Sequence, residues 1–310
     1  MAVLLAGAVV FTPDRQADAA GCSVSNVRTA VIFGVLQAAV DAASEGDTLR
    51  VKGTCVGTTM IRLTSLHLRG VPTAAQPAPA LDGGGQGRAL ILSSARVVLR
   101  DLIVSHGKAR YGGGIRLRYS RLSLKGDTSI AGNTAEMEGG GVYLGTDCLL
   151  TLQDSVTITS NIAGYGGGVA NVFGTLTMTG SASVTGNTAE HDGGGIMNDE
   201  AILALSGAAS VTGNEAGESG GGIWNRRRSW LGLRDSTTVT GNVAGKGGGG
   251  IANVRRSTLV LSDSASVTGN TAGTIGGGVR NTTGTVSVCS DLVAISPNDP
   301  DDPPPTLPCA

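Results

Sequence analysis

Aromatic residues are scarce in this chain. Its 310 residues include three Phe, two Trp and four Tyr, whereas Gly occurs 50 times. A core built around large rings is therefore excluded, and Val, Ile and Leu have to supply the buried surface instead. Each such side chain contributes about 1.5–3 kcal/mol when it is fully buried, so a continuous aliphatic core is sufficient to stabilise a fold.

Net charge and long apolar runs are also missing. The 23 basic and 24 acidic residues leave a net charge of −1, so the chain has no general attraction for nucleic acid. The longest apolar run, residues 2–11, is too short to span a membrane. It precedes Ala17-Asp18-Ala19, a small-x-small cleavage pattern. We interpret residues 1–20 as a secretory signal peptide, truncated at its basic start, and expect a secreted or cell-surface protein without a membrane span.

What the chain has instead is a repeat. Seven glycine triplets, each followed by Ile or Val, begin 27 or 28 residues apart, at Gly112, Gly139, Gly166, Gly193, Gly220, Gly248 and Gly276. A fixed period of this length indicates one supersecondary unit that stacks on copies of itself. No repeat shows helical periodicity, which excludes a helical solenoid.

Each repeat contains three short runs in which apolar and polar residues alternate. In one unit these runs are Leu176–Met178, residues 183–185 and the residues that follow Gly193. Alternation bounded by Gly, Ser, Asn and Asp is typical of strands. Three strands joined by tight turns form one triangular coil. The sequence therefore predicts an all-β protein, a single-stranded parallel β-helix of about 8–10 coils of ~27 residues, with regular repeats over residues 111–292.

Asparagines follow the same period. One lies five or six residues before each of six triplets, at Asn133, Asn161, Asn187, Asn214, Asn242 and Asn270. Amides at the same corner of successive coils can hydrogen-bond to one another, so we predict a structural ladder. A second column, three residues past the triplets, is formed by Asn171, Asn198, Asn225, Asn253 and Asn281. It is predicted to start late, because Leu117 and Leu144 occupy its first two positions.

The segments outside the repeats are predicted to close the two ends. Residues 21–60 should contain a capping helix and the first strand, because Val31, Val35, Leu36 and Ala39 fall on one helical face and an open β-helix end needs a cover. Residues 61–110 are interpreted as irregular first coils. Residues 293–310 are interpreted as an extended Pro/Asp-rich tail.

Five cysteines in an exported chain indicate disulfides. Cys22 and Cys55 bracket the cap, and we predict that they pair. Cys289 and Cys309 bracket the tail, and we predict a second bond between them. Cys148 is then left without a partner.

The repeats resemble a known superfamily. The pattern Ser/Thr-x-Val/Ile-Thr-Gly-Asn-x-Ala, followed by Gly-Gly-Gly-Ile/Val-x-Asn, recurs between Tyr111 and Asn281. It is similar to the repeats of pectin-lyase-like right-handed β-helix proteins and, more narrowly, of secreted bacterial proteins related to polymorphic outer membrane proteins and adhesins. The resemblance implies a right-handed coil. It implies no single activity, because such proteins include lyases, hydrolases and adhesins.

Catalytic and metal-binding candidates are few. A calcium-dependent lyase needs clustered carboxylates, and the candidates are acids in the loop before the triplets: Glu136, Glu138, Glu190 and Asp192. Their alternative interpretation is a solvated acidic turn. The paired aspartates of a polysaccharide hydrolase are absent from the coils. We therefore expect no metal and no cofactor, with calcium as the alternative.

The favoured binding site is a strip of basic and aromatic residues along the third strand and the turn after it. Its members are Arg116, Tyr143, Trp224, Arg226, Arg227, Arg228, Arg255 and Arg256. An aromatic face beside clustered guanidinium groups can stack on sugar rings and hold carboxylated or sulfated glycans. The alternative is a surface on which long side chains only cover neighbouring turns.

We therefore expect an exported, monomeric, non-catalytic surface-interaction or scaffold protein that binds anionic glycans, either a polysaccharide or a cell-surface component. One alternative is a polysaccharide lyase or glycoside hydrolase of the same superfamily. A remote alternative is ice binding through the Ser/Thr-x-Thr face of the second strands, which β-branched propensity on an exposed strand also explains.

Overall fold

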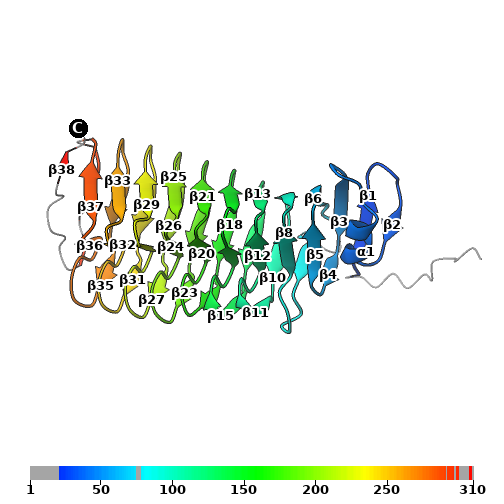
Figure 1. Ribbon diagram of the computed structural model, residues 1–310, viewed down its shortest axis with the longest axis horizontal. Helices are drawn as coiled ribbons and strands as arrows, with labels where there is room; N and C mark the ends of the chain where they lie inside the picture. Colours follow the sequence, from blue (N-terminus) through cyan, green and yellow to red (C-terminus); the bar gives the residue numbers. More distant parts are fainter. Residues whose placement is uncertain (1–20, 75–77, 291, 297, 300–306, 309–310) are drawn as a thin grey trace, which may run out of the picture.

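The chain forms a rod of stacked coils (Figure 1). The computed structural model describes all residues except 1–20, 75–77, 291, 297, 300–306 and 309–310. Within the described residues, strands of successive coils pair in parallel and form four long sheets of 13, 9, 7 and 9 strands. The predicted all-β parallel β-helix is thereby confirmed as a parallel β-solenoid. We number its sheets 1 to 4 in the order in which a coil enters them.

Each regular coil contributes one strand to every sheet. One coil supplies β21 (Thr175–Met178) to sheet 1, β22 (Ser183–Thr185) to sheet 2, β23 (Thr188–Ala189) to sheet 3 and β24 (Ile196–Asp199) to sheet 4. The sequence predicts only three of these four strands. In the later coils the strands of sheet 3, such as β23, have two residues, which are too few to show alternation.

Sheets 1 and 2 run along most of the rod. Sheet 1 also contains β1 (Ser23–Asn26), β2 (Ile32–Phe33), β3 (Thr48–Lys52), β6 (Ser65–Gly70), β9 (Arg96–Arg100), β13 (Arg121–Lys125), β17 (Leu149–Leu152), β25 (Ile202–Leu205), β29 (Trp230–Leu233), β33 (Thr258–Leu261), β37 (Thr285–Val288) and β38 (Leu307–Pro308). Sheet 2 also contains β4 (Thr54–Val56), β7 (Ala80–Asp82), β10 (Ile103–Ser105), β14 (Ser129–Ala131), β18 (Thr157–Thr159), β26 (Ser210–Thr212), β30 (Thr238–Thr240) and β34 (Ser266–Thr268).

Sheets 3 and 4 complete each coil. Sheet 3 also contains β11 (Lys108–Tyr111), β15 (Thr134–Glu138), β19 (Ile162–Ala163), β27 (Glu215–Ala216), β31 (Val243–Ala244) and β35 (Thr271–Ala272). Sheet 4 also contains β5 (Thr59–Arg62), β8 (Leu90–Ser93), β12 (Ile115–Arg118), β16 (Val142–Leu144), β20 (Val169–Val172), β28 (Ile223–Arg226), β32 (Ile251–Val254) and β36 (Val279–Thr282). Segment 61–110 pairs in register in sheets 1, 2 and 4, and it differs from the later coils because sheet 3 begins only at β11.

The inward side chains of sheets 1, 2 and 4 form the core. In sheet 1, Leu176 pairs with Leu150 of the preceding coil and Leu203 of the next, and all three are fully buried. Val184 and Ile196 take equivalent inward positions in sheets 2 and 4. These columns join into one cluster of buried residues that extends along the rod, as the aliphatic columns of the sequence predict.

The predicted asparagine ladder is confirmed. Asn187 Nδ2 donates hydrogen bonds to Asn214 Oδ1 and to the carbonyl oxygen of Ile158, each at 2.9 Å. Asn214 Oδ1 also accepts the backbone N–H of Asn187 at 3.0 Å. The same side-chain bonds join all six predicted residues, which are buried. The ladder continues to Asn298, which the prediction omits.

The second asparagine column is also hydrogen-bonded. From Asn171 to Asn281, each Nδ2 donates to the Oδ1 of the next coil at 2.8–2.9 Å. The column begins at Asn171, as predicted, because Leu144 occupies the position before it. Among the described residues, Asn171 Oδ1 therefore has no hydrogen-bond partner.

The glycine triplets form the corner between sheets 3 and 4. Gly193 has a φ of +70°, which L-residues with side chains seldom adopt. A Cβ atom on Gly194 would lie 2.4 Å from the backbone oxygens of Glu215 and Gly221 in the next coil. The corner therefore needs glycine for two separate reasons, a backbone conformation and a close approach between coils.

The N-terminal end differs from the predicted capping helix. The only helix among the described residues, α1 (Leu36–Asp41), has six residues and lies beside the antiparallel strands β1 and β2. Val31 and Val35, predicted to face the core, are 48% and 58% exposed. The predicted capping helix is therefore not confirmed, because Val31, Ile32 and Phe33 are β-branched or aromatic residues that favour a strand.

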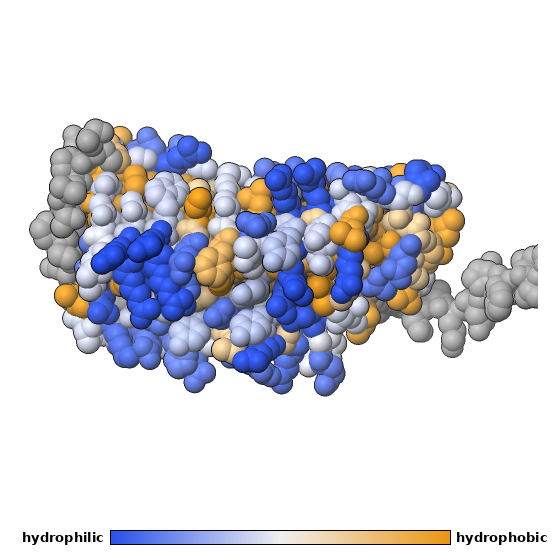
Figure 2. All heavy atoms as spheres, in the orientation of Figure 1, coloured by the Kyte–Doolittle hydropathy of each residue, from blue (hydrophilic) through white to orange (hydrophobic). Residues whose placement is uncertain are grey.

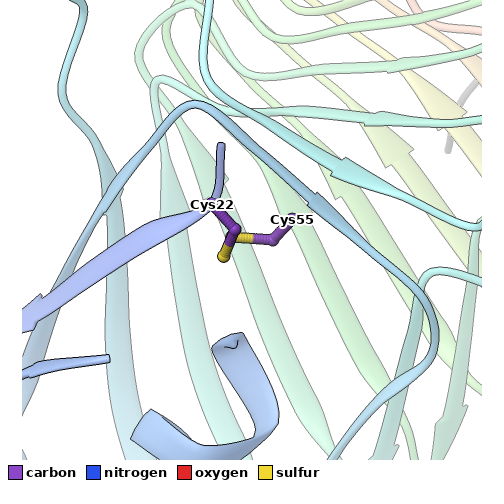
Figure 3. The surroundings of a disulfide bond; sticks show 2 residues. All are labelled: Cys22 and Cys55. Carbon is purple, nitrogen blue, oxygen red and sulfur yellow. A yellow bond between two sulfur atoms is a disulfide. The ribbon is translucent and has the colours of Figure 1, made fainter. Parts of the chain in front are cut away.

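The cysteines follow the prediction as far as the described residues test it. Cys22 and Cys55 form a disulfide that ties the start of β1 to β4 (Figure 3). Cys148 is free and buried. The predicted bond from Cys289 to Cys309 stays a prediction, since Cys309 lies outside the described residues.

Part of the predicted tail continues the solenoid. Ala294 forms a parallel bridge with Ser266, and Asp299 forms one with Thr271. Asn298 extends the ladder between these two bridges. This stretch is therefore a further partial coil and not the extended segment that its composition predicts.

Candidate functional site

Trp224 is buried, although it occupies an outward position of sheet 4. Its side chain belongs to a second apolar cluster with Ala170, Met197 and Ala252, and it is only 7% exposed. The ring of Tyr165 stacks on the indole, with centroids 5.8 Å apart and planes at 15°. The indole thus packs inside the protein and does not offer the exposed stacking face on which the predicted binding role depends.

Tyr165, which covers Trp224, is the residue before a glycine triplet. At this position, Glu138 bridges to Tyr165 in parallel, and Asp192 takes the corresponding place in the next coil. The segment between sheets 3 and 4 therefore folds over the outer face of sheet 4. The alternation of the sequence distinguishes inward from outward residues, but it does not show what lies above the outward ones.

Arg226 is also part of this packing. Its guanidinium carbon lies 4.1 Å from the centre of the Trp224 ring, and its Nη2 contacts Asp199 Oδ2 at 2.6 Å. Asp199 is buried and also pairs with Arg227 Nη1 at 2.9 Å. Burial lowers the pKa of Arg226, while Asp199 acts in the opposite direction. Arg226 thus caps the indole and balances a buried carboxylate.

Four arginines project from the turn between sheets 4 and 1. These residues, which we call the arginine shelf, are Arg227, Arg228, Arg255 and Arg256. All four are exposed, and only Arg227 forms an ion pair within the described part of the chain. The turns stack through hydrogen bonds from Arg228 N to Arg255 O at 3.2 Å and from Arg256 N to Thr283 O at 3.0 Å. Figure 2 shows strongly hydrophilic side chains gathered near β32 and β36, beside paler and hydrophobic ones.

The shelf exists because the turn after sheet 4 is one residue longer in these two coils than in the coils directly before and after them. In the preceding coils the same turn holds a single residue with positive φ, such as Phe173 or Glu200. The two 28-residue repeats place a second such residue there, so that Arg227 and Arg228, like Arg255 and Arg256, have φ between 55° and 65°. Residues other than glycine seldom adopt this conformation. The backbone would accept Gly or Asn more readily than Arg.

Trp230 supplies the exposed indole that the sequence assigns to Trp224. It begins β29, directly after the first arginine turn, and is 40% exposed. Its ring lies over Gly232, where a side chain would clash with it. The strand partners of Gly232 are Ala204 and Val260, and together with Arg234 these residues surround an open cavity of about 320 Å³.

The other predicted sugar-binding residues lie three and four coils from the nearest shelf residue. Arg116 and Tyr143 are half-buried neighbours in sheet 4. The guanidinium of Arg116 lies 5.9 Å from the centre of the Tyr143 ring. The structure therefore separates the predicted strip into a buried aromatic centre, an exposed arginine shelf and an Arg–Tyr pair nearer the N-terminal end.

The acidic candidates do not converge. Glu136 and Glu190 are exposed. Glu138 is half-buried and Asp192 is buried, in coils on either side of Tyr165, and burial raises the pKa of each carboxyl group. The described residues contain no group of three or more His, Cys, Asp or Glu side chains that could hold a metal ion.

The hydroxyl face of sheet 2 has the predicted regular spacing. Ser183 pairs with Ser210 and Thr185 with Thr212, so two columns of hydroxyl groups run along the rod. These side chains are half-buried. The regular spacing of the hydroxyl groups follows directly from the in-register stacking of similar coils.

No family model, curated protein or solved structure matches this chain. None of the helices in the described residues is both long and apolar enough to cross a membrane. The surfaces of the molecule are therefore the basis on which its function is inferred.

Proposed function

We propose that this protein is an exported, non-catalytic, monomeric β-helix that binds anionic glycans through the arginine shelf and Trp230. Strands of neighbouring coils lie about 4.8 Å apart, so the shelf presents two closely spaced pairs of guanidinium groups. Guanidinium binds carboxylate and sulfate-like groups through paired hydrogen bonds. The exposed face of Trp230 adds an apolar surface on which a sugar ring can stack.

The observation that carries this proposal is the lengthening of two consecutive coils at the same turn. Each added residue leaves an arginine in a backbone conformation that costs of order 1 kcal/mol or more. The side chains of Arg228, Arg255 and Arg256 are exposed and therefore bury little surface that could offset this cost. A function for the side chains accounts for their retention.

Two further features support the proposed export of the protein and its proposed relation to pectin-lyase-like β-helices. The disulfide between Cys22 and Cys55 favours an oxidising compartment. Residues 1–20, which carry the proposed signal peptide, lie outside the described residues. The repeat pattern and the parallel coils support a right-handed, pectin-lyase-like β-helix, because parallel crossover connections are almost always right-handed.

Glycoside hydrolysis is a second candidate with one observation in its favour. Glu138 and Asp192 are carboxyl groups of raised pKa on one face, two coils or roughly 10 Å apart. That spacing is near the range of the two carboxyl groups in inverting glycosidases. Tyr165 lies between them, so this candidate requires Tyr165 to move when a sugar binds.

The test is retention on immobilised heparin and on immobilised polygalacturonate, with dextran as the neutral control. The variant Arg228→Gln/Arg256→Gln should elute at lower salt than the parent protein, because exposed charge attraction is screened within about 8 Å at physiological salt. The matched control Arg50→Gln/Arg62→Gln removes the same charge from an exposed part of the N-terminal coils. Equal elution of the two variants would reject the shelf. New reducing ends in the polygalacturonate would favour the hydrolase.

A further inference from the structure

A separate pocket lies on the outer face of sheet 4, nearer the N-terminal end than the shelf. It has a volume of about 260 Å³, and its walls include Arg116, Arg118, Tyr119, Tyr143, Gly145 and Phe173. We call it the Gly145 pocket. Pockets that bind small molecules usually have volumes of about 300–1,000 Å³. The Gly145 pocket is slightly smaller than this range, so it has room for a single sugar ring and not for an oligosaccharide.

The pocket is open because residue 145 has no side chain. The equivalent position is Val172 in the next coil and Val254 further along. Nothing in the backbone requires glycine here: a Cβ on Gly145 would meet only Leu117 O at 3.5 Å and Tyr143 Cε1 at 3.7 Å, which are ordinary contacts. Gly145 therefore matters for the space that it leaves open, whereas the first glycine of each triplet is needed because the backbone has a positive φ there.

Aromatic rings gather around this space. Tyr119 and Phe173 are 60% and 48% exposed and belong to the turns of the coils on either side of Gly145. Both have positive φ, 49° and 58°, which is costly for bulky residues. The two turns are two coils apart, roughly 10 Å. The turn of the intervening coil lies between them, supplies Gly145 and Thr146 to the pocket and carries the exposed Asp147. Three of the chain's few aromatic residues thus line one pocket.

The pocket is also positively charged. Arg116 and Arg118 both line it, and none of its lining residues is acidic. The guanidinium of Arg116 lies over the rings of Tyr111 and Tyr143, at 5.8 and 5.9 Å from their centres. Its Nε is buried and has no hydrogen-bond partner among the described residues. A buried donor in this state is costly unless a ligand satisfies it.

We propose that the Gly145 pocket binds one carboxylated sugar residue. The ring lies between Tyr119 and Phe173, and the carboxylate accepts hydrogen bonds from Arg116 and Arg118. The pocket and the shelf lie in the same row of turns, since Tyr119, Phe173 and Arg227 are equivalent positive-φ residues. In this respect the inference rests on the proposed function: the pocket holds one acidic residue of the glycan whose neighbouring part lies on the shelf.

The experiment measures binding of free sodium glucuronate by saturation-transfer NMR, with glucose as the neutral control. The parent protein should bind glucuronate and not glucose. Gly145→Val should abolish this binding, because valine fills the pocket as it does at position 172. The matched control Thr282→Val places valine at the equivalent position of β36 and should bind glucuronate as the parent does. If Gly145→Val lowers the thermal midpoint, Phe173→Ala replaces it, and it too should lose the binding.

Three outcomes would overturn the pocket: no glucuronate binding by the parent, unchanged binding by Gly145→Val and Phe173→Ala, or equal binding of glucose. Retention on heparin is measured on the same proteins. Because Gly145→Val leaves the shelf intact, it should retain heparin binding. If the shelf variant keeps the heparin retention of the parent while the parent binds glucuronate, the proposed function alone is rejected. If the shelf variant loses retention but the parent does not bind glucuronate, the pocket alone is rejected.

Discussion

The outer faces of sheets 4 and 1 carry one tryptophan each, six positions apart in the chain, and the two residues have opposite environments. Trp224 is 7% exposed beneath Tyr165 and Arg226, whereas Trp230 is 40% exposed over Gly232. Both occupy outward positions of a strand. The difference arises because the chain between sheets 3 and 4 folds back over sheet 4, while nothing in the described residues covers the outer face of sheet 1 at Trp230.

This comparison separates two roles of large residues on a solenoid surface. On sheet 4 they build a second, smaller core that fixes the segment before each triplet. On sheet 1 and on the adjoining turn they project into solvent. Substitutions at the two tryptophans should therefore separate stability from binding.

The largest effect is expected for Trp224→Ala. Removing this buried ring should lower the free energy of unfolding by about 3–5 kcal/mol and leave heparin retention of the folded protein unchanged. Chemical denaturation and heparin chromatography measure the two quantities. Normal stability together with lost retention would show that Trp224 is a binding residue after all.

A smaller loss is expected on the inward side of the same strand. Asn225 Oδ1 accepts from Asn198 Nδ2 at 2.8 Å, and its own Nδ2 donates to Asn253 Oδ1 at 2.8 Å. Asn225→Ala leaves these buried groups with fewer partners and should cost about 1–3 kcal/mol. The denaturation midpoint measures this cost. A midpoint equal to that of the parent would mean that the second ladder is not a buried network.

The covered face should also make stability depend on pH. Burial raises the pKa of Glu138 and Asp192 in the folded protein. The folded state therefore binds protons more tightly than the unfolded state, and stability falls as pH rises from the ordinary carboxyl range to these raised values. Glu138→Gln/Asp192→Asn should remove this part of the dependence. Identical slopes of unfolding free energy against pH would contradict the burial of these two groups.

The smallest effect on stability is expected for Trp230→Ala. An exposed side chain of this kind contributes within about 0.5 kcal/mol, so the thermal midpoint should hardly change. Retention on heparin and polygalacturonate should nevertheless decrease, because the stacking surface is lost. A large fall in stability would place Trp230 in the same class as Trp224 and remove the contrast between the faces.

Much of the fold follows from local repetition. The triplet spacing, the inward aliphatic columns and the asparagines specify coils, core and ladder, because each coil uses the same residues in the same places. The same spacing also predicts Asn298 as a ladder residue, because it follows Asn270 by 28 residues, the period of the last repeats. The Pro- and Asp-rich composition around it obscured the signal.

The features that escaped sequence reasoning depend on contacts between coils at non-repeating positions. The residues before the triplets are chemically diverse, including Glu138, Tyr165 and Asp192, so no pattern predicts that Tyr165 covers Trp224. The form of the cap differs from the predicted helix because β-branched residues that also fit a helical face lie in an antiparallel strand. The arginine shelf did leave a signal, since the change from 27 to 28 residues marks the coils that carry it.

The central claim is that the two lengthened coils exist to present arginines. Deleting Arg228 and Arg256 returns both turns to the length of the preceding coils, in which one positive-φ residue follows the strand. The shortened protein should keep the parent's thermal midpoint and elute from heparin at clearly lower salt. Unchanged elution from a folded, shortened protein would contradict this claim.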